Sequence, residues 1–464
     1  MIKDLLKNFS TLAIGTLGSK LLALLIVPIY TSALSTTDIG KYDLINTVIS
    51  MAIPLITLNI AEGVLRFLLD SKYDADQVKR VGHKYIWISV CIFTIVTIIV
   101  TIMGFGNITL PQMLIILSMY LSDVWYNYYL REKRGEGFFK GIAIAGILNT
   151  VVCFVLCCLF LLVLHFGVEG YAVTYVIGNA VAIAYLVFFC KKKTENIIIG
   201  QSDYKNVESE VLAYSKPLII NAISWWINDY SDRYIIIWLR GIAESGVYSV
   251  AYKIPSILNI IQTIFNQAWV VTTVKAEENG NFKDVRRVYI AYKSVLFIGC
   301  AGLLFITKYI ASFLYAKDFF VAWTFTPYLI TAIIYSSLSG CIGGILAAKK
   351  MTRLYALSTL IGAAVNIILN IVLVKSIGTM GAAIATLISC IVVYIVRVIY
   401  LRVKNGIVLN DIMQYLIAIP LFLEMMLVRF EAPLEYRVIS LAVNIIINGY
   451  IAYCALFRKG KYNE

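Results

Sequence analysis

Apolar runs of about 20 residues recur along the whole chain, and short polar stretches separate them. At about 1.5 Å per residue, a helix of that length crosses roughly 30 Å of hydrocarbon. The runs are continuous rather than alternating with a period of two, which predicts membrane-spanning helices and not barrel strands. Fourteen spans are predicted, at 9–33, 42–69, 84–104, 111–130, 141–164, 171–190, 217–239, 247–273, 294–314, 322–347, 356–375, 381–401, 412–428 and 438–457.

Composition and charge agree with a polytopic membrane protein. Only 14% of the residues are charged, whereas soluble domains carry about 25%, and the mean hydropathy is +0.82. Of the 40 Lys and Arg residues, 28 fall on the predicted side of the N-terminus and 6 on the other side. This bias predicts that both termini are cytoplasmic. Topology and attraction to anionic lipid account for the net charge of +13, so no nucleic-acid partner is expected.

Metal and redox chemistry finds no support in the sequence. The nine cysteines all fall in or at the ends of predicted spans, which favours small buried apolar residues over a disulfide framework. The two histidines, His83 and His165, lie near span ends, and no Walker-type glycine loop is present. We therefore expect no metal site, no cofactor and no enzymatic activity.

The chain repeats itself. The stretch "TTDIGKYDLINTVIS" at 36–50 matches "IAESGVYSVAYKIPS" at 242–256 at an offset of 206. Further along, "GVEGYAVTYVIG" at 167–178 matches "GTMGAAIATLIS" at 378–389 at an offset of 211. Two matches in the same order, at similar offsets, indicate an old duplication. The matched residues are Asp38 with Glu244, Gly40 with Gly246, Tyr42 with Tyr248, Gly167 with Gly378, Gly170 with Gly381 and Ala172 with Ala383.

The duplication predicts an all-α polytopic membrane protein with about 14 transmembrane helices. Each half holds six spans, and because six is even, both halves insert in the same orientation. A pseudo-two-fold axis along the membrane normal would relate them, as in parallel-repeat transporters. The predicted segments are an N-terminal six-helix lobe at 1–190, a cytoplasmic linker at 191–216 that is partly an amphipathic helix, a C-terminal six-helix lobe at 217–404 and two extra transmembrane helices at 405–464.

This arrangement resembles a known family. The six-plus-six-plus-two spans, the (D/E)-x-G-x-Y turn after the first and seventh spans and the GxxGAA entry to the twelfth are similar to the polysaccharide-export branch of the MOP superfamily. That branch holds the Wzx-type flippases, and the resemblance covers nearly the whole chain. It implies a MATE-like (MOP) fold and a substrate in which pyrophosphate joins an oligosaccharide to undecaprenol. Lipid II flippases and MATE antiporters are related branches.

Polar side chains inside the predicted spans mark the candidate site. A charge at the bilayer centre costs roughly 2.5–3.5 kcal/mol on insertion scales, so each one indicates a function. In the seventh span, Asn221, Ser224, Asn228 and Asp232 recur at helical spacing on one face, and the eighth span has a similar stripe. We interpret the stripes as the lining of a wet cavity, with interhelical hydrogen bonding as the alternative. The predicted substrate-binding residues are Lys20, Arg66, Arg233, Lys253, Asn221, Asn228, Asn259 and Gln267; the coupling-ion candidates are Asp43, Glu62, Asp123, Asp229 and Asp232.

Other intramembrane charges allow simpler interpretations. Glu62 and Arg66 are four residues apart and either neutralise each other or act in the site. Lys308 and Arg397 lie near span ends and are expected to extend to the membrane surface. Glu424 falls in the two extra helices, where the sequence provides it with no partner.

The function expected from these features is a flippase that moves undecaprenyl-pyrophosphate-linked oligosaccharide by alternating access, for surface polysaccharide biosynthesis. Coupling to H⁺ or Na⁺ is expected. An ion-coupled multidrug or small-molecule antiporter and a lipid II flippase stay open. A polytopic oligosaccharide polymerase needs large extramembrane loops, which the predicted topology lacks, and a scaffold has no need of charged span interiors.

Location and partners follow from the same features. The resemblance implies a multi-pass protein of the bacterial cytoplasmic membrane that acts as a monomer. Its expected partners are membrane lipid and polyprenyl-linked oligosaccharide, with transient association with polysaccharide polymerase and chain-length machinery.

Overall fold

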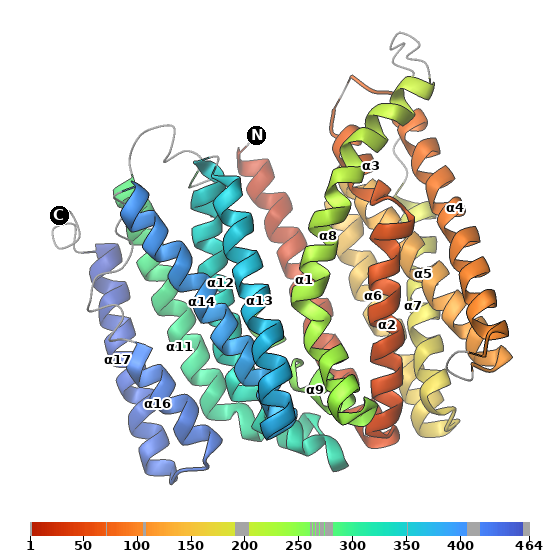
Figure 1. Ribbon diagram of the computed structural model, residues 1–464. Helices are drawn as coiled ribbons and strands as arrows, with labels where there is room; N and C mark the ends of the chain where they lie inside the picture. The colour runs from red at the N-terminus through yellow and green to blue at the C-terminus, as the bar shows by residue number, and fades with distance from the viewer. Residues whose placement is uncertain are drawn as a thin grey trace. The chain divides into compact units, whose positions relative to one another are not determined.

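A computed structural model of the chain (Figure 1) describes residues 2–70, 72–104, 108–190, 204–259, 282–349, 351–405 and 418–457, with positions 262, 265, 269 and 273. The side chains of 2–17, 282–284, 347, 348, 352, 405, 456 and 457 lie outside this description. All regular structure in the described residues is helical. The chain divides into two compact units, Met1–Ser231 (unit 1) and Asp232–Glu464 (unit 2).

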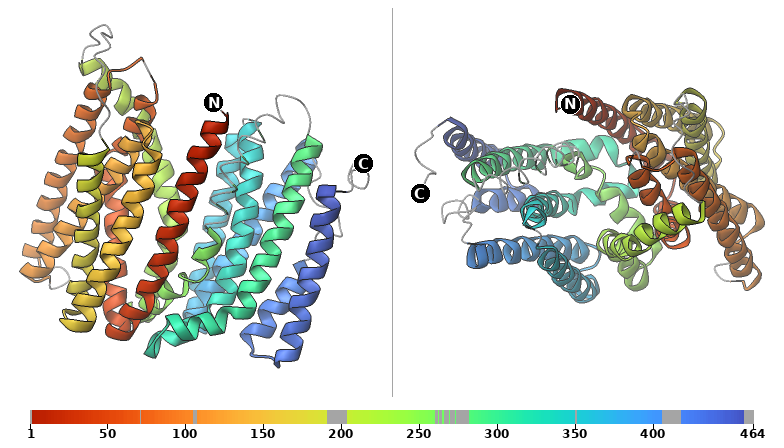
Figure 2. Two further views of the ribbon diagram at one scale, coloured as in Figure 1. Left: turned by 180° about the vertical axis from the view of Figure 1, so that it is seen from behind. Right: turned by 90° about the horizontal axis from the view of Figure 1, so that it is seen from above.

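Unit 1 is a bundle in which α6 packs against α1 and α7, and α5 packs against α3, α4 and α7 (Figures 1 and 2). A π-helical segment, Cys158–Val163, continues α6. The helices of unit 1 are α1 (Ile2–Ala33), α2 (Thr36–Ile56), α3 (Ile60–Leu68), α4 (Ala75–Ile102), α5 (Leu110–Gly135), α6 (Phe139–Cys157), α7 (Gly167–Phe189) and the first part of α8 (Tyr204–Arg240).

The start of α2 explains the acid of the repeated turn. Ser35 and Asp38 form a capping box, in which the Asp38 N–H donates to Ser35 Oγ at 3.1 Å and the Ser35 N–H donates to Asp38 Oδ2 at 3.2 Å. The matching acid of unit 2, Glu244, accepts a hydrogen bond from Thr379. The acid of the motif therefore stabilises local structure in both units.

The second predicted span, 42–69, is wrong as a single helix. The chain leaves α2 after Ile56, and Leu58 and Asn59 adopt left-handed φ angles of 55° and 54° before α3 begins. No glycine occupies this break and the apolar run continues across it, so a prediction from hydrophobicity treats the two helices as one span. The short α3 places Ile60 and Val64 in the core.

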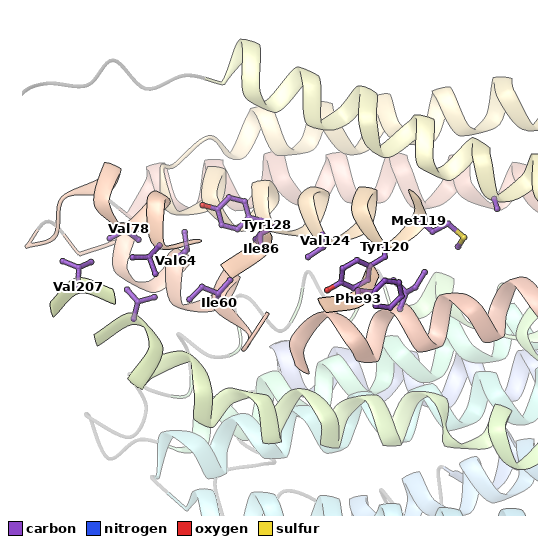
Figure 3. Close-up of a cluster of buried hydrophobic side chains, with 14 residues drawn as sticks. Ile60, Val64, Val78, Ile86, Phe93, Met119, Tyr120, Val124, Tyr128 and Val207 are labelled. Atoms are coloured by element: carbon purple, nitrogen blue, oxygen red, sulfur yellow. The ribbon is translucent and has the colours of Figure 1, made fainter. Parts of the chain in front are cut away.

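A hydrophobic cluster joins α3, α4, α5 and the first part of α8 (Figure 3). Phe93 and Tyr120 stack at 3.8 Å between ring centroids, and Val207 of α8 packs into the same cluster. Gly63 permits the close approach of α8, because a Cβ there would collide with Ser215 Oγ. Residues 204–216 of the predicted linker are therefore a docked helical segment, and residues 191–203 lie outside the described part of the chain.

Unit 2 contains the remaining helices, and its last two pack against α11 and α12 (Figures 1 and 2). In the described residues of the predicted span 247–273, the helix ends at Ala251 and a turn follows over 252–255, so this span is not one uninterrupted helix. The helices of unit 2 are α9 (Ile242–Ala251), α11 (Phe282–Leu314), α12 (Thr326–Ala348), α13 (Thr352–Ile377), α14 (Met380–Asn405), α16 (Ala418–Arg429) and α17 (Leu434–Phe457), with a 3₁₀ segment at Lys317–Thr324.

The structure confirms an all-α polytopic membrane protein. Within the described residues, 9 helices are long and apolar enough to cross a membrane, and the shorter apolar helix Gly18–Ala33 adds to them. The number of fourteen spans and the division into two six-helix lobes stay predictions. None of the nine cysteines, all of which lie in the described residues, forms a disulfide.

The two units differ in how far their spans are buried. In α11 and α12, 61% and 78% of the span is buried within the protein, whereas α4 and α6 reach only 22% and 17%. α12 packs chiefly against α14 and α11 against α17, and α16 contacts both α11 and α12, so neighbouring helices enclose these two spans. The extra helices thus cover a surface that would otherwise face lipid.

Candidate functional site

Asp232 is the centre of a buried polar network in unit 2. Its side chain is 3% exposed, and it accepts hydrogen bonds from Asn370 Nδ2 at 2.7 Å, Thr386 Oγ1 at 2.6 Å and Tyr248 OH at 2.9 Å. These donors come from α13, α14 and α9, so four helices meet at one carboxylate. All three donors are neutral, and no ion pair to Asp232 occurs among the described residues.

More oxygen atoms surround this carboxylate. Asn370 Nδ2 also lies 3.0 Å from Asn366 Oδ1, and Thr386 Oγ1 lies 2.9 Å from the carbonyl oxygen of Ala382. Asn370 Oδ1 is buried without a hydrogen-bond donor among the described residues. Carboxylate, amide, hydroxyl and carbonyl oxygens are the ligands that hard cations prefer. The arrangement can bind a proton or a monovalent cation.

A related network surrounds Asp123 in unit 1. Asn179 Nδ2 of α7 donates to Asp123 Oδ1 at 2.6 Å, and Asn149 Nδ2 of α6 donates to Asn179 Oδ1 at 2.7 Å. Asp123 is half-buried on α5, and like Asp232 it forms no ion pair with any of the described residues. Each unit therefore contains a carboxylate that accepts a hydrogen bond from an asparagine side chain of another helix.

The repeated tyrosine has a different neighbour in each unit. Tyr248 donates to Asp232, whereas its counterpart Tyr42 packs edge-on against Tyr171 with ring centroids 4.7 Å apart. Tyr171 and Tyr175 share a hydrogen bond at 3.0 Å between their hydroxyls. The same position of the duplication thus supports an aromatic cluster in unit 1 and an acid in unit 2.

The predicted basic residues lie in separate environments. Lys20 is exposed on α1, and Lys253 is half-buried just beyond the end of α9. The Arg233 guanidinium lies over the Tyr252 ring, 5.9 Å from its centroid. Since Asp232 is held by neutral donors, neutralisation of Arg233 or Lys253 is not its observed role.

Glu62 and Arg66 do not neutralise each other, so that interpretation is wrong. Arg131 Nε donates to Glu62 Oε1 at 2.8 Å, whereas Arg66 lies 3.9 Å from Asp70. The break before α3 sets the two residues on a short helix that faces α5, and α5 carries Arg131.

The polar stripe of the seventh span changes character along α8. Asn221 and Asp229 are exposed, while Asn228 is half-buried and donates to the Ser224 carbonyl oxygen at 3.0 Å. Asp232 alone enters a buried network of side chains from other helices. Of the other candidates, Asp43 is half-buried on α2 and Asn259 is half-buried beyond α9, whereas Gln267 lies outside the described residues.

The sequence did not identify the residues that hold the two acids. Asn366 and Asn370, one turn apart in an apolar span, were the signal available for unit 2, and Asn149 and Asn179 were single amides in apolar spans of unit 1. Thr386 gave no signal, because a single threonine is common in membrane helices.

Arg397 corrects another expectation. It does not extend to the membrane surface: it is 4% exposed and donates to Ser358 Oγ, Thr359 Oγ1 and the Ser339 carbonyl oxygen. Gly343 leaves room for this buried guanidinium, because a Cβ there would lie 3.1 Å from Arg397 Nη1. The guanidinium also lies 4.5 Å from the centroid of the Tyr355 ring. Lys308, in contrast, pairs with Glu431 beyond the end of α16.

Comparisons with known proteins place the chain among glycan-related membrane proteins. Residues 5–272 match the family described as "Polysaccharide biosynthesis protein". The chain is 27% identical over 209 residues to a probable low-salt glycan biosynthesis flippase, Agl15, of Haloferax volcanii, an alignment that spans 44% of each chain. It is 24% identical over 376 residues to an uncharacterised membrane protein of Methanocaldococcus jannaschii, covering 75% of this chain and 86% of that protein.

Solved structures share the fold. An inward-facing multidrug resistance MATE family transporter of the MOP superfamily superposes with a TM-score of 0.67 at 17% identity, covering 83% of this chain and 94% of the other. The lipid II flippase MurJ in an inward closed conformation gives a TM-score of 0.64 at 14% identity, covering 95% and 98%. These similarities confirm the MATE-like (MOP) fold.

Proposed function

Because this chain belongs to the polysaccharide biosynthesis protein family, we propose that it is a flippase for polyprenyl-pyrophosphate-linked oligosaccharide. Family membership over more than half of the chain, on a transporter fold, is the observation that carries this proposal. The similarity to the glycan biosynthesis flippase Agl15 supports it. Undecaprenol as the carrier and a bacterial cytoplasmic membrane with cytoplasmic termini are parts of the same proposal.

Asp232 is the proposed coupling site. A carboxylate that is 3% exposed and receives only neutral hydrogen bonds keeps a negative charge that a proton or Na⁺ can compensate. Because its partners come from three other helices, occupancy of this site would change how α8, α9, α13 and α14 pack. Such a dependence of packing on an ion is what alternating access needs.

The basic residues are proposed to hold the pyrophosphate. Lys20 is exposed on α1 and forms no ion pair among the described residues, so its charge is available to an anion. Arg233 and Lys253 of unit 2 are separate candidates, while the pairing of Arg66 with Asp70 makes Arg66 a weaker candidate. Asparagine side chains such as Asn228 would bind sugar hydroxyls.

The experiment is a transfer assay with the full chain in liposomes. The substrate is a polyprenyl-pyrophosphate oligosaccharide with a fluorescent sugar, and a membrane-impermeant quencher reports which leaflet holds the head. We expect the protein to speed transfer, and a Na⁺ or H⁺ gradient to speed it further. Asp232→Asn should remove the gradient dependence. Asp318 is an exposed acid of the same unit, and Asp318→Asn should keep the gradient dependence.

Transfer equal to that of protein-free liposomes would contradict the flippase proposal. Gradient dependence that survives in Asp232→Asn would contradict only the coupling site. A multidrug antiporter is the second candidate, because the MATE transporter shares the fold at a TM-score of 0.67. Efflux of cationic dyes without transfer of the lipid-linked sugar would favour that function.

A further inference from the structure

The two C-terminal helices contain a second buried carboxyl group, which the proposed function does not use. Glu424 of α16 is 0% exposed, and the facing side of α17 presents Asn444 at 0% and Ser440 at 6% exposure. The two helices contact each other and pack on α11 and α12. This cluster lies outside the duplicated part of the sequence.

The hydrogen bonds fix the orientation of the Asn444 amide. Its Nδ2 lies 2.7 Å from Glu424 Oε2, 3.1 Å from the Pro420 carbonyl oxygen and 3.0 Å from the Ser440 carbonyl oxygen. All three neighbours are acceptors, so the nitrogen and not the oxygen must face them. Asn444 Oδ1 is therefore the amide atom that none of these three acceptors contacts.

Three oxygen atoms of the cluster lack a donor. Glu424 Oε1, Asn444 Oδ1 and Ser440 Oγ are all buried without a hydrogen-bond partner among the described residues. Burying a polar atom without a partner is costly, and burying an uncompensated charge is more so. Three such atoms in one cluster indicate that the cluster binds a ligand in addition to its protein contacts.

No described cation neutralises Glu424. On the neighbouring helices, Lys308 pairs with Glu431, and the Arg429 guanidinium lies 5.8 Å from the centroid of the Phe430 ring. Glu424 itself forms no ion pair among the described residues. Among the described residues, the hydrogen bond that its carboxyl group receives comes from the neutral amide of Asn444.

We propose that Glu424 Oε1, Asn444 Oδ1 and Ser440 Oγ bind a dehydrated monovalent cation such as Na⁺. One positive charge cancels the single carboxylate, whereas Ca²⁺ sites use more carboxylates. A proton on Glu424, together with the hydroxyl hydrogen of Ser440, is the competing way to satisfy these oxygens, and infrared spectroscopy distinguishes it from a cation that contacts all three. The bound ion would hold α16 to α17 and stabilise the packing of the pair on α11 and α12.

The test measures the effect of Na⁺ on thermal stability. The full chain is purified in detergent as Asp232→Asn, which removes the other candidate ion site. Its Tm is compared in NaCl and in N-methylglucamine chloride at equal ionic strength. A saturating ion that binds only the folded state should raise Tm by about 3 °C or more. Glu424→Gln should abolish the shift, and Glu435→Gln, an exposed acid of α17, should keep it.

Ser440→Ala provides a second variant that does not touch the charge. Loss of one oxygen ligand should weaken the apparent Na⁺ affinity about tenfold, read from the dependence of Tm on Na⁺ concentration. Unchanged affinity in Ser440→Ala would overturn the site even if Glu424→Gln failed to fold. A Na⁺ shift that persists in Glu424→Gln would overturn it as well.

Infrared spectroscopy separates a cation from a proton. With Na⁺ bound, Glu424 is ionised, so Glu424→Gln should change no protonated-carboxyl band in Na⁺ buffer. A protonated-carboxyl band that is present at every Na⁺ concentration and disappears in Glu424→Gln would show that a proton alone occupies the site, which contradicts the proposal.

Discussion

The two units compensate their acidic side chains in different ways. At one end of unit 1, cations neutralise the acids: Lys79 Nζ lies 2.5 Å from Glu136, and Lys133 Nζ lies 2.9 Å from Glu132. In unit 2, Asp232 and Glu424 are 3% and 0% exposed, and they receive hydrogen bonds from neutral groups only. Glu132 and Glu136 are therefore already paired, whereas Asp232 and Glu424 retain a charge that an ion can compensate.

Asp123 lies between these two patterns. Like Asp232 it is bonded to asparagine, but it is half-buried and has one donor, whereas Asp232 has three. Asp232 is thus the more buried of the two carboxylates and the one with more hydrogen-bond donors. The difference teaches that the number of converging donors, and not the presence of an acid, distinguishes the stronger candidate site.

The largest expected effect comes from removing each acid. Asp232→Ala removes three buried hydrogen bonds, each worth about 1 kcal/mol or more, so unit 2 should lose about 3 kcal/mol or more. Asp123→Ala leaves one donor, Asn179, and should cost about 1 kcal/mol. Denaturant unfolding in detergent measures both, with Asp318→Ala as an exposed control. Equal losses for the two variants would remove the distinction between the units.

The repeated tyrosines sharpen the comparison. Tyr248→Phe removes one hydrogen bond to Asp232 and should destabilise unit 2 by about 1 kcal/mol. Tyr42→Phe keeps the ring that packs on Tyr171, and no hydrogen bond of its hydroxyl occurs among the described residues, so we expect a change below about 0.5 kcal/mol. The same unfolding measurement applies, and a larger effect at Tyr42 would reverse the assignment.

The paired acids of unit 1 should make its stability depend on pH. Burial raises the pKa of Glu132, but His83 and Lys133 outweigh burial and leave the pKa below the ordinary value of 4.5. A lowered folded pKa stabilises the fold above pH 4.5, and this contribution disappears as the pH falls further through the folded pKa. Thermal unfolding from pH 7 down to acid should show a steeper loss in the wild type than in Glu132→Gln. Parallel curves would contradict the pairing.

The smallest expected effect concerns the docking of α8. Lys84 Nζ donates to Glu208 Oε1 at 2.7 Å, which is also the acceptor of Tyr85 OH at 2.9 Å. Lys84 is 48% exposed, so a double-mutant cycle of Lys84→Ala and Glu208→Ala should give a coupling energy of about 0.5 kcal/mol. High salt should reduce it. A coupling above about 2 kcal/mol would mean that the pair, rather than the apolar cluster around Val207, holds the helix.

The sequence predicted most helices because apolar length alone determines whether a segment can span a membrane. It missed the break at Leu58 and Asn59, since neither glycine nor proline occupies those positions and the apolar run continues across them. It identified Asp232 but not its partners, because Asn370 and Thr386 lie 138 and 154 residues further along the chain. Such pairings depend on tertiary packing between helices that are distant in sequence, and the spacing of residues within one helix does not predict them.

Arg397 illustrates the same limit. Its distance from the span end agreed with a surface position, but neutral acceptors on α12 and α13 hold it inside unit 2. Hydrophobicity indicates where a charge is unusual, and only the neighbouring helices determine how it is compensated.

The cover that α16 and α17 provide for α11 and α12 has a consequence for what holds the pair in place. Lipid tails are about as apolar as the side chains they would replace, so the pair gains little from the hydrophobic effect inside a membrane. A chain that ended after α14 would exchange helix contacts for annular lipid, and its α11 and α12 are apolar enough to accept it. The C-terminal pair could therefore be exchanged for lipid at little hydrophobic cost, so its packing depends on shape and on polar contacts such as the one between Glu424 and Asn444.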